Sequence, residues 1–504
     1  MSVKRHVILF LITVFTSVNA LTLTEALDKS ITISPEIKEK QKRYEEIYYD
    51  IKMATSGYLP KIDFIATSAL NDSTIENSKD NDHEIELLFT QNIFSGFKDI
   101  SKRNLELSKY GSALYTTKDL VNSYSLEVIE AYLSLLREKK MLDIQYASLE
   151  NHEEILQKIT KKYNAGMGTQ LELRLSKTSL NLAKINYHDQ KNSRTQLKIT
   201  LEKYLNEEVD VSSLTYPNDK VVIPCSIENA LKIAYKNHPS IYIAKLNKQM
   251  SDYELQFTKK DLYPSLDFKA KYSTGENGIY QNTDEYYRMY LELSYNLYNG
   301  GSNINEKEKI KKKIAQKNSI IAKVKRDITH KLKSKFDEYL MLKERVKLLN
   351  NYVSSKELAL ESYYSQFSIG KANLQDILDT TESLYIAKRL ALDGKFNLLI
   401  SSYRVLEAMG SLPKISYHNQ KVMKVANSEE EKKVFFIKKS KKDCFIVTAT
   451  KLNIRENMST SSNILGTYSK DETICIKKRE NLWVQTDDGW VSITYLKPEN
   501  KSNI

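Results

Sequence analysis

Apolar residues recur at every seventh position along much of the first half of the chain. The series runs through Ile100, Leu107, Leu114, Val121, Val128, Leu135, Leu142, Leu149, Leu156 and Tyr163. A strict seven-residue period is typical of a long helix that packs with other helices in a left-handed coiled coil. With a rise of ~1.5 Å per residue, a helix from Ile100 to Tyr163 spans roughly 95 Å.

A second long helix is predicted in the other half of the chain. Its apolar series is Leu332, Tyr339, Val346, Val353, Leu360 and Phe367, but Lys311, Asn318 and Lys325 hold the same register before it. We therefore expect its first third to face water or a different neighbour. Shorter helices at about 170–208 and 373–409 follow the long ones, which predicts two helical hairpins. A further helix is expected over 23–55.

Period-two alternation predicts strands ahead of each hairpin. The clearest strand is Tyr286 to Tyr298, where Tyr287, Met289, Leu291, Leu293, Tyr295 and Leu297 alternate with polar residues. About eleven alternating residues are the length that a tilted strand needs to cross a bilayer. Weaker alternation occurs around Ile62–Thr67 and Leu266–Tyr272. The Asn- and Asp-rich segments Asn71–Asp82 and Thr274–Asp284 are predicted to be exposed loops.

The two halves are copies of one structural unit. Gly166 and Gly370, the predicted hairpin tips, lie 204 residues apart, and the same offset aligns Pro35 with Pro239, Asp63-Phe64 with Asp267-Phe268, and Gly96 with Gly300. A chance register would not keep such different residue types aligned over so long a stretch. We predict a first repeat at 21–210 and a second at 211–413.

The N-terminus predicts export. Lys4 and Arg5 precede an apolar run from Val7 to Phe15, and Val18-Asn19-Ala20 offers small residues for cleavage, so residues 1–20 are interpreted as a signal peptide. No later stretch approaches the ~20 apolar residues of a membrane helix. A hairpin on a soluble core is the commoner explanation of such strands. Export, and the lack of other strands for these to join, favour a membrane barrel built from several chains, since lipid does not tolerate open sheet edges.

Charge and chemistry exclude several classes. The net charge is +12, but residues 411–442 alone hold nine Lys and three Glu, and the other lysines alternate with Glu along helices. Nucleic-acid binding is therefore not expected. The chain shows no zinc pattern, phosphate loop or nucleophile elbow, so we expect no metal, no cofactor and no enzyme activity. Cys225 lies near the boundary of the two repeats without an evident catalytic partner.

The C-terminal part departs from the repeats. Residues 414–442 are predicted to be a basic linker, and short strands resume over 443–498. Leu452-Asn-Ile-Arg455, Ile464-Leu-Gly466 and Asp488-Gly-Trp-Val491 give this segment a resemblance to bacterial SH3-like barrels, a family that binds cell-wall peptides or other extended ligands. Trp483 and Trp490 either line such a ligand groove or fill a very small core. In an oxidising compartment Cys444 and Cys475 can form a disulfide.

Residues 23–410 resemble the TolC-type outer-membrane factors of bacterial efflux and type I secretion. The resemblance rests on Leu262-Tyr-Pro-Ser-Leu-Asp-Phe268, Tyr295-Asn-Leu-Tyr-Asn-Gly-Gly301 and the tip from Gly370 to Asp379. It implies an α+β fold in which a homotrimer forms a transmembrane β-barrel from four strands per chain, continued by a long α-helical coiled-coil barrel in the periplasm. It also implies an exit duct that works with a periplasmic adaptor protein and an inner-membrane transporter.

The resemblance assigns roles to the hairpin tips. Acidic residues just after the second tip, here Asp376 and Asp379, form a constricting ring around a three-fold axis; the alternative is that they only complement a helix dipole. The tips themselves contact the adaptor, which implicates Gly166, Met167, Gly168, Thr169, Gly370, Lys371, Ala372 and Asn373. Ala372 stands where the family often places a basic residue, so an ionic lock there is in doubt unless Lys371 substitutes.

Two other classes remain as alternatives. A cell-wall hydrolase often carries an SH3-like barrel, but residues 23–410 leave no room for a catalytic domain. An exported coiled-coil structural or cell-wall-binding protein without transport is the second. The transported substrate is not encoded in any motif found in the chain.

Overall fold

The computed structural model describes residues 20–73, 78–217, 221–277, 282–412, 444–475, 478–480, 483–486 and 488–498. The predicted signal peptide, apart from Ala20, and the predicted linker lie outside these ranges. The chain divides into two compact units, Met1–Val422 and Met423–Ile504. Each unit is described by itself.

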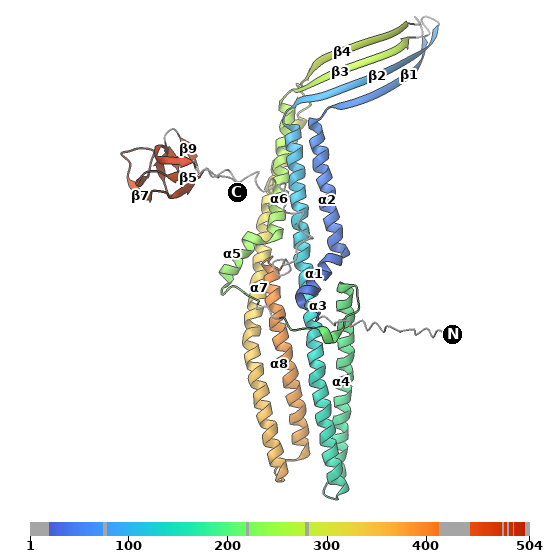
Figure 1. Cartoon of the computed structure of the whole chain (residues 1–504), viewed down its shortest axis with the longest axis vertical. Helices are drawn as coiled ribbons and strands as arrows, with labels where there is room; N and C mark the ends of the chain where they lie inside the picture. The colour runs from blue at the N-terminus through green and yellow to red at the C-terminus, as the bar shows by residue number, and fades with distance from the viewer. Residues whose placement is uncertain are drawn as a thin grey trace, which may run out of the picture. The chain divides into compact units, whose positions relative to one another are not determined.

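Two helical hairpins form most of the first unit (Figure 1). Helix α3 spans Lys98–Asn164 and returns as α4, Gln170–Leu205; α7 spans Ser302–Ser368 and returns as α8, Leu374–Ala408. The two long helices have 67 residues each, which corresponds to roughly 100 Å. The predicted hairpins are present, and their turns fall at the predicted glycines.

The single helix predicted over 23–55 is wrong, because the structure has two helices there. Helix α1 spans Leu23–Ile33 and α2 spans Pro35–Thr55. Proline disfavours helical backbone in the residue before it, and Ser34 instead caps α2 by accepting a hydrogen bond from the Ile37 amide at 3.3 Å. The second repeat has the same break: His238 separates α5, Ile227–Asn237, from α6, Pro239–Phe257. Short 3-10 turns follow at Ser56–Tyr58, Val211–Ser213 and Thr258–Leu262.

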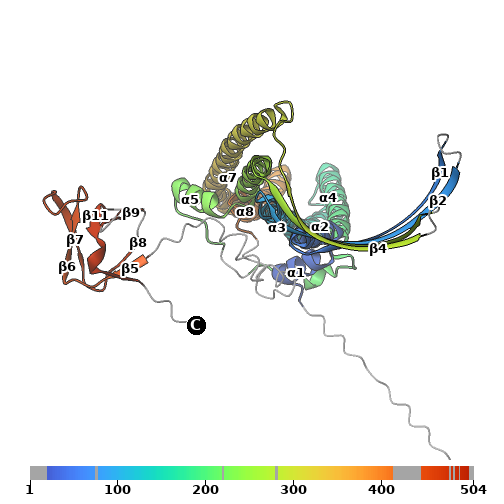
Figure 2. The same cartoon turned by 90° about the horizontal axis from the view of Figure 1, so that it is seen from above.

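Four antiparallel strands form one curved sheet in the order β1-β2-β3-β4 (Figure 2). They span Lys61–Ser73, Ser78–Ser95, Ser265–Asn277 and Asn282–Ser294. The predicted loops are therefore too long, because backbone pairing continues to Ser73↔Ser78 and Asn277↔Asn282 whatever the side chains are. The predicted end at Tyr298 is also wrong: β3 begins at Ser265, whose partner is Ser294, so later residues have no neighbouring strand.

The largest core surrounds the middle of α3. Tyr132 is fully buried there, and its hydroxyl donates to the Leu21 and Thr215 carbonyls at 2.7 and 2.8 Å. The core joins α1, α3, α4 and α8 through apolar residues that include Leu27, Val128, Leu135, Leu201 and Tyr403. Both repeats thus meet at mid-height.

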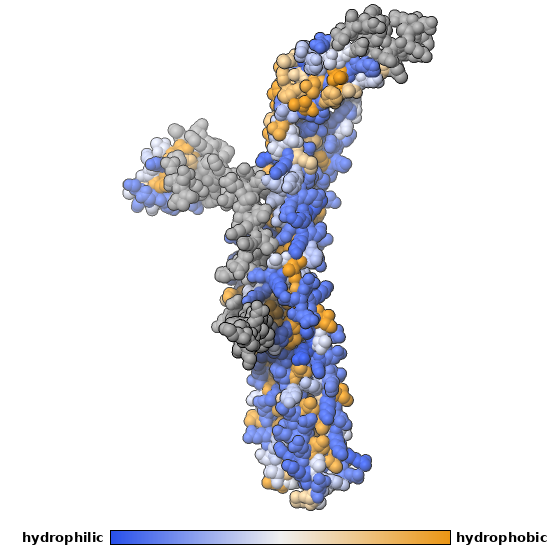
Figure 3. Space-filling model, turned by 45° about the vertical axis from the view of Figure 1, so that its right-hand side comes forward, coloured by the Kyte–Doolittle hydropathy of each residue, from blue (hydrophilic) through white to orange (hydrophobic). Residues whose placement is uncertain are grey.

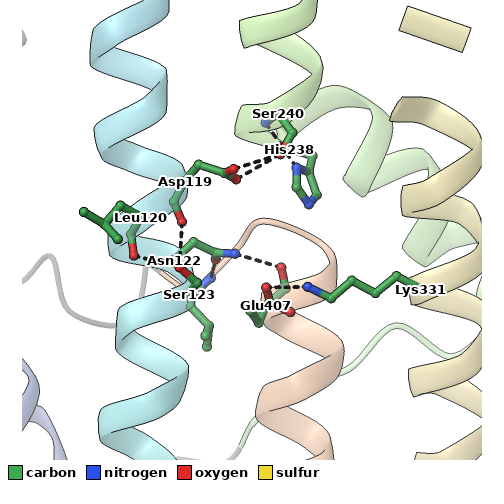
Figure 4. A network of polar contacts seen from close by, with 9 residues as sticks. Asp119, Leu120, Asn122, Ser123, His238, Ser240, Lys331 and Glu407 are labelled. Atoms are coloured by element: carbon green, nitrogen blue, oxygen red, sulfur yellow. Dashed lines mark hydrogen bonds and ion pairs between the residues drawn. The ribbon is translucent and has the colours of Figure 1, made fainter. Parts of the chain in front are cut away.

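A polar network fixes the end of α8 at the same level (Figure 4). The buried Asn122 amide donates to the Glu407 carbonyl at 2.9 Å, and its oxygen accepts from the Leu412 amide at 3.2 Å. The Glu407 carboxylate pairs with Lys331 of α7 at 2.7 Å. On the other side, Ser240 donates to Asp119 of α3. Four helices from the two repeats are therefore tied together by hydrogen bonds.

The second unit consists of short strands: β5 Cys444–Val447, β6 Lys451–Arg455, β7 Ile464–Ser469, β8 Thr473–Cys475, β9 Lys478–Glu480, β10 Trp483–Gln485, β11 Trp490–Ser492 and β12 Leu496–Pro498. A turn at Ile493–Tyr495 precedes β12. They form a sheet in the order β7-β6-β11-β10-β9 and another in the order β12-β5-β8. The register places Cys444 opposite Cys475. The SH3-like assignment stays a prediction.

Candidate functional site

The strand register sorts the side chains of the four-stranded sheet by polarity. One face carries the apolar residues Ile62, Phe64, Leu87, Phe89, Phe268, Ala270, Tyr272, Met289, Leu291 and Leu293, which are paired across neighbouring strands. Phe64 is 68% exposed and Met289 is 75% exposed, so the described part of the chain leaves them largely uncovered. An uncovered apolar sheet face of this size is suited to lipid or to another apolar partner.

The opposite face is charged and internally paired. It carries Glu84, Glu86, Asp267, Lys269, Lys271, Arg288 and Glu292. Lys271 pairs with Glu86 at 2.7 Å, and Lys269 pairs with Glu292 at 2.7 Å across the strands. Asn92 donates to Asp267 at 2.7 Å. This face is built for water, and the strands β1 and β4 lie at its two edges without a further partner strand in the described chain.

Aromatic residues gather where the sheet meets the helices. Phe94, Phe97 and Tyr263 make edge-to-face contacts with centroid distances of 5.5, 6.2 and 5.6 Å. Tyr58 and Tyr295 nearby are 43% and 51% exposed. Figure 3 shows hydrophobic residues concentrated at this junction, above a largely hydrophilic helical body. Aromatic residues of this kind typically mark the boundary between lipid and water.

The far ends of the hairpins have the same local design in both repeats. Gly166 and Gly370 adopt left-handed backbone, with φ of 74° and 72°, and end α3 and α7. Thr169 then caps α4 and Asn373 caps α8. Met167, at the first tip, is 71% exposed. The predicted tip residues are therefore all placed at one end of the helical body, away from the sheet.

Both caps are closed by an acidic residue at the third helical position. At the first tip the Thr169 amide donates to Glu172 at 2.7 Å, and at the second the Asn373 amide donates to Asp376 at 3.0 Å. The Asp376 amide donates back to the Asn373 side chain at 2.9 Å. The hydrogen bond from the Thr169 backbone is the main reason why the pKa of Glu172 is lowered. Capping boxes of this type stabilise the first turn of a helix.

Asp376 and Asp379 lie on one side of α8. The buried residues Leu374, Ile377 and Leu378 occupy the other side and pack with Ile155 and Ile159 of α3. Asp379 is exposed and accepts a hydrogen bond from Gln375 at 2.7 Å. Within one chain, the two carboxylates therefore have only local partners in the described structure. The acidic ring stays a prediction that depends on further chains.

Lys162 is a tip residue that the sequence analysis missed. Its ammonium lies 3.6 Å from the Glu172 carboxylate and 5.2 Å from the centre of the Phe367 ring, so it contacts both hairpins. The repeat offset carried the signal for Glu172, since it aligns this residue with Asp376. For Lys162 no sequence signal existed, because its partners become neighbours only when the hairpins pack. Lys371 is exposed.

Solved structures share this fold. The chain matches a structure of CusC with a TM-score of 0.69 at 12% identity, covering 77% of this chain and 92% of that one. It matches the outer membrane protein VceC of Vibrio cholerae with a TM-score of 0.66 at 14% identity, covering 77% and 96%. The CmeC outer membrane channel of Campylobacter jejuni has a TM-score of 0.66 at 15% identity, covering 81% and 89%. The chain therefore shares the fold of these proteins.

Sequence comparison gives the family. Residues 26–207 and 230–411 match the sequence profile of the outer membrane efflux protein family. The chain is 22% identical over 403 residues to the outer membrane protein TolC of Escherichia coli, covering 75% of this chain and 80% of the relative. It is 17% identical over 287 residues to the alkaline protease secretion protein AprF of Pseudomonas aeruginosa, covering 56% and 60%. The chain belongs to the outer membrane efflux protein family.

Each of the two matched segments contains a strand pair and a helical hairpin. Among the residues that the structure describes, no helix combines the length and the apolar character that a membrane-spanning helix requires.

Proposed function

We propose that this protein is the outer-membrane exit duct of a tripartite efflux or type I secretion system. The observation that carries the proposal is the sheet with one exposed apolar face, one charged face and an aromatic border at its junction with the helices. Such a sheet is suited to a barrel wall with lipid outside and water inside. The long helices then extend the water-filled path into the periplasm.

Three copies of the chain complete the duct in this proposal. The edges of β1 and β4 carry unpaired backbone groups, which lipid does not tolerate, so each edge requires a strand from another chain. Four strands from each of three chains give a closed barrel of twelve. The TolC and AprF relatives support this assignment by their family membership.

The tips form the periplasmic entrance of the duct. Asp376 is half-buried and Asp379 is exposed, and both lie on the side of α8 opposite its buried residues, so three chains would gather six carboxylates around the axis. Such a ring favours cations and narrows the opening. The exposed tip residues around Gly166 and Gly370 contact the periplasmic adaptor. The adaptor in turn connects the duct to the inner-membrane transporter.

Fractionation and electrical recording test the proposal. We expect a heat-modifiable trimer in the outer-membrane fraction, and channels after addition of the purified protein to planar bilayers. A monomer in the periplasmic fraction would contradict the assignment. If the wild-type protein forms channels, the double variant Asp376→Ala with Asp379→Ala should have a higher conductance. Its block by divalent cations should be weaker than that of wild type.

Glu172→Ala is the matched control for the ring. Glu172 holds the same capping position in the first repeat. Its replacement therefore removes an equivalent capping interaction from α4 and leaves the cap of α8 intact. If Glu172→Ala and the double variant change conductance equally, the effect comes from helix capping and the ring assignment fails.

A second function is suggested by the two tryptophans. The core of the C-terminal unit is filled by Val447, Leu452, Ile454, Val484 and Val491 together with Tyr468 and Ile474, and it includes neither tryptophan. Gln485 pairs with Trp490 and Trp483 pairs with Ser492, so both rings lie on the sheet face opposite the buried valines. Arg455 adjoins Trp490 on the next strand. We propose that this face binds peptidoglycan.

Binding of the full-length protein to purified sacculi tests this second function. Trp483→Ala with Trp490→Ala should reduce co-sedimentation at least tenfold, which corresponds to about 1.4 kcal/mol. Replacement of the exposed Tyr495 by Ala serves as the control for a general loss of aromatic surface. Unchanged retention of the double variant would rule out the tryptophan face as the binding surface.

A further inference from the structure

His152 lies in the contact between α3 and α8, where the two hairpins of one chain meet. Its side chain is 2% exposed, and neither ring nitrogen has a hydrogen-bond partner. Buried polar groups in folded proteins are nearly always hydrogen-bonded, and leaving one unpaired costs ~1–3 kcal/mol. The packing of the two hairpins therefore buries a titratable side chain that has no hydrogen-bond partner.

The groups near His152 come from helices α3, α7 and α8. Glu382 of α8 is the nearest charge, with its Oε2 atom 4.0 Å from the imidazole Nε2 and its side chain 29% exposed. Tyr385, also on α8, donates to the Ala147 carbonyl of α3 at 2.9 Å. Tyr364 of α7 faces Asn151 and Thr381.

Two further buried acceptors of this contact, Asn151 Oδ1 and Thr381 Oγ1, do not accept a hydrogen bond from the imidazole. On α3 itself, Glu150 and Glu154 act on the Tyr385 hydroxyl rather than on the imidazole. Helix α4 also packs on α3, and its buried residues Ser176, Leu180 and Ala183 carry no titratable group. Glu382 is thus the one carboxylate in reach of His152 within the described structure, and it lies beyond hydrogen-bond distance.

Protonation is incompatible with this packing. An imidazolium donates from both ring nitrogens and needs two acceptors, and here it finds none within hydrogen-bond distance. Burial lowers the pKa of His152. A group whose pKa is lower in the folded state stabilises that state above its unfolded pKa, near 6.5, and this contribution is lost as the pH falls further.

We propose that His152 is a proton-sensitive joint, at which protonation loosens the packing of α8 against α3. Glu382 lies eight residues after the start of α8, or ~12 Å from the tip. Loosening there frees the helix that carries Asp376 and Asp379. The joint itself is a property of one chain; its effect on the entrance rests on the proposed channel function.

Hydrogen exchange of the purified full-length protein tests the joint without requiring a channel. After correction for the intrinsic chemical rate, amides in 145–155 and 378–388 should exchange roughly tenfold faster at pH 5 than at pH 7.5. His152→Gln should abolish this difference, because glutamine does not titrate. His188→Gln on the exposed side of α4 should leave it intact.

Glu382→Gln is the second variant, and it keeps His152 in place. Removal of the nearby negative charge should lower the pKa of His152 further. The midpoint of the pH-dependent change in amide exchange should therefore move to lower pH. If the wild-type amides exchange more slowly at pH 5 than at pH 7.5, protonation draws Glu382 towards His152 and tightens the contact between α3 and α8. That result would overturn the proposal. Equal pH dependence in wild type and His152→Gln would overturn it as well.

Conductance separates the joint from the channel. If the protein forms channels, wild type should open more at pH 5 and His152→Gln should not. If no channels form while the exchange result holds, the channel function fails and the joint stands. If channels form and His152→Gln responds to acid as wild type does, the joint does not govern the entrance.

Discussion

Asp376 is engaged by the backbone of its own helix even in a single chain. It forms the capping box of α8 with Asn373 from the third helical position, and Glu172 holds the same position in the capping box of α4 with Thr169. The capping role explains why an acid stands at this position in both repeats. In the proposed constriction Asp376 would serve in addition to its capping role, whereas Asp379 takes no part in the cap and accepts a hydrogen bond from Gln375.

The caps predict a local loss of stability. Thr169→Ala and Asn373→Ala should each cost about 1 kcal/mol at the first turn of α4 and α8, because backbone amides lose their acceptor. Faster hydrogen exchange of those first-turn amides measures the effect. Thr178→Ala, in the middle of α4, removes only a hydroxyl that donates to the Arg174 carbonyl and should leave exchange unchanged. Equal effects at all three sites would contradict the capping explanation.

His238 predicts a second, independent response to acid. It is 6% exposed, caps α6 through its Nδ1 atom, and burial lowers its pKa to about 4. Because the pKa is depressed from ~6.5, the folded state should lose about 3 kcal/mol from this group as the pH falls from 7 towards 4. His238→Asn keeps a capping acceptor and does not titrate.

Unfolding measured across this pH range checks the prediction for His238. The stability difference between wild type and His238→Asn should shrink or reverse with acidification, since only wild type pays to bury a charge at that site. Parallel curves at all pH values would show that His238 does not contribute to the pH dependence.

The two long helices are equal in length but not in environment. Helix α3 is buried along most of its length, whereas α7 buries only Ile310, Ile328, Leu332, Phe336 and Leu342 among the described residues. Ile304, Leu348 and Leu358 of α7 are 70%, 69% and 62% exposed. Lys311 and Lys325 predict such a difference for the first third of this helix, and the exposed Leu348 and Leu358 lie beyond that third. Exposed apolar residues along one helix are consistent with packing against another copy of the chain.

The sheet faces make a matched test available on one strand. Phe64→Arg places a charge on the apolar face of β1, which should cost about 2–4 kcal/mol near the middle of the bilayer. Thr67→Arg, three residues on, lies on the polar face opposite Glu84 and should be tolerated. The yield of heat-modifiable trimer in the outer-membrane fraction measures both. Equal yields would mean that the apolar face does not contact lipid.

At the scale of the whole molecule, the family accounts for one of the two compact units. The matched segments end at residue 411, and Leu412 completes the contact with Asn122 that fixes the end of α8. The C-terminal unit has its own core and its own sheets, so its function is separable from that of the duct.

Truncation tests this separation. A chain that stops after Pro413 keeps the Leu412 contact and should form trimers with wild-type conductance, while its retention on sacculi should fall to the level of the tryptophan variants. Loss of the trimer on truncation would show that the C-terminal unit takes part in assembly.

The sequence alone determined the features that depend on local periodicity. Heptads predicted the long helices, alternation predicted the sheet, and the offset of 204 residues predicted two copies of one unit. These signals survive because a helix or a strand repeats its geometry regardless of what it packs against. The resemblance to outer-membrane factors followed from the order of those elements.

Only the tertiary structure decided where the strands end and which distant residues meet. The break at Ser34 has a local cause in Pro35, whereas β4 stops at Ser294 because its partner strand begins at Ser265. Lys162 with Phe367, and His152 with Glu382, are brought together by hairpin packing and leave no trace in spacing. Contacts between residues more than two hundred positions apart are set by the fold, so the chemistry of the joint became visible only there.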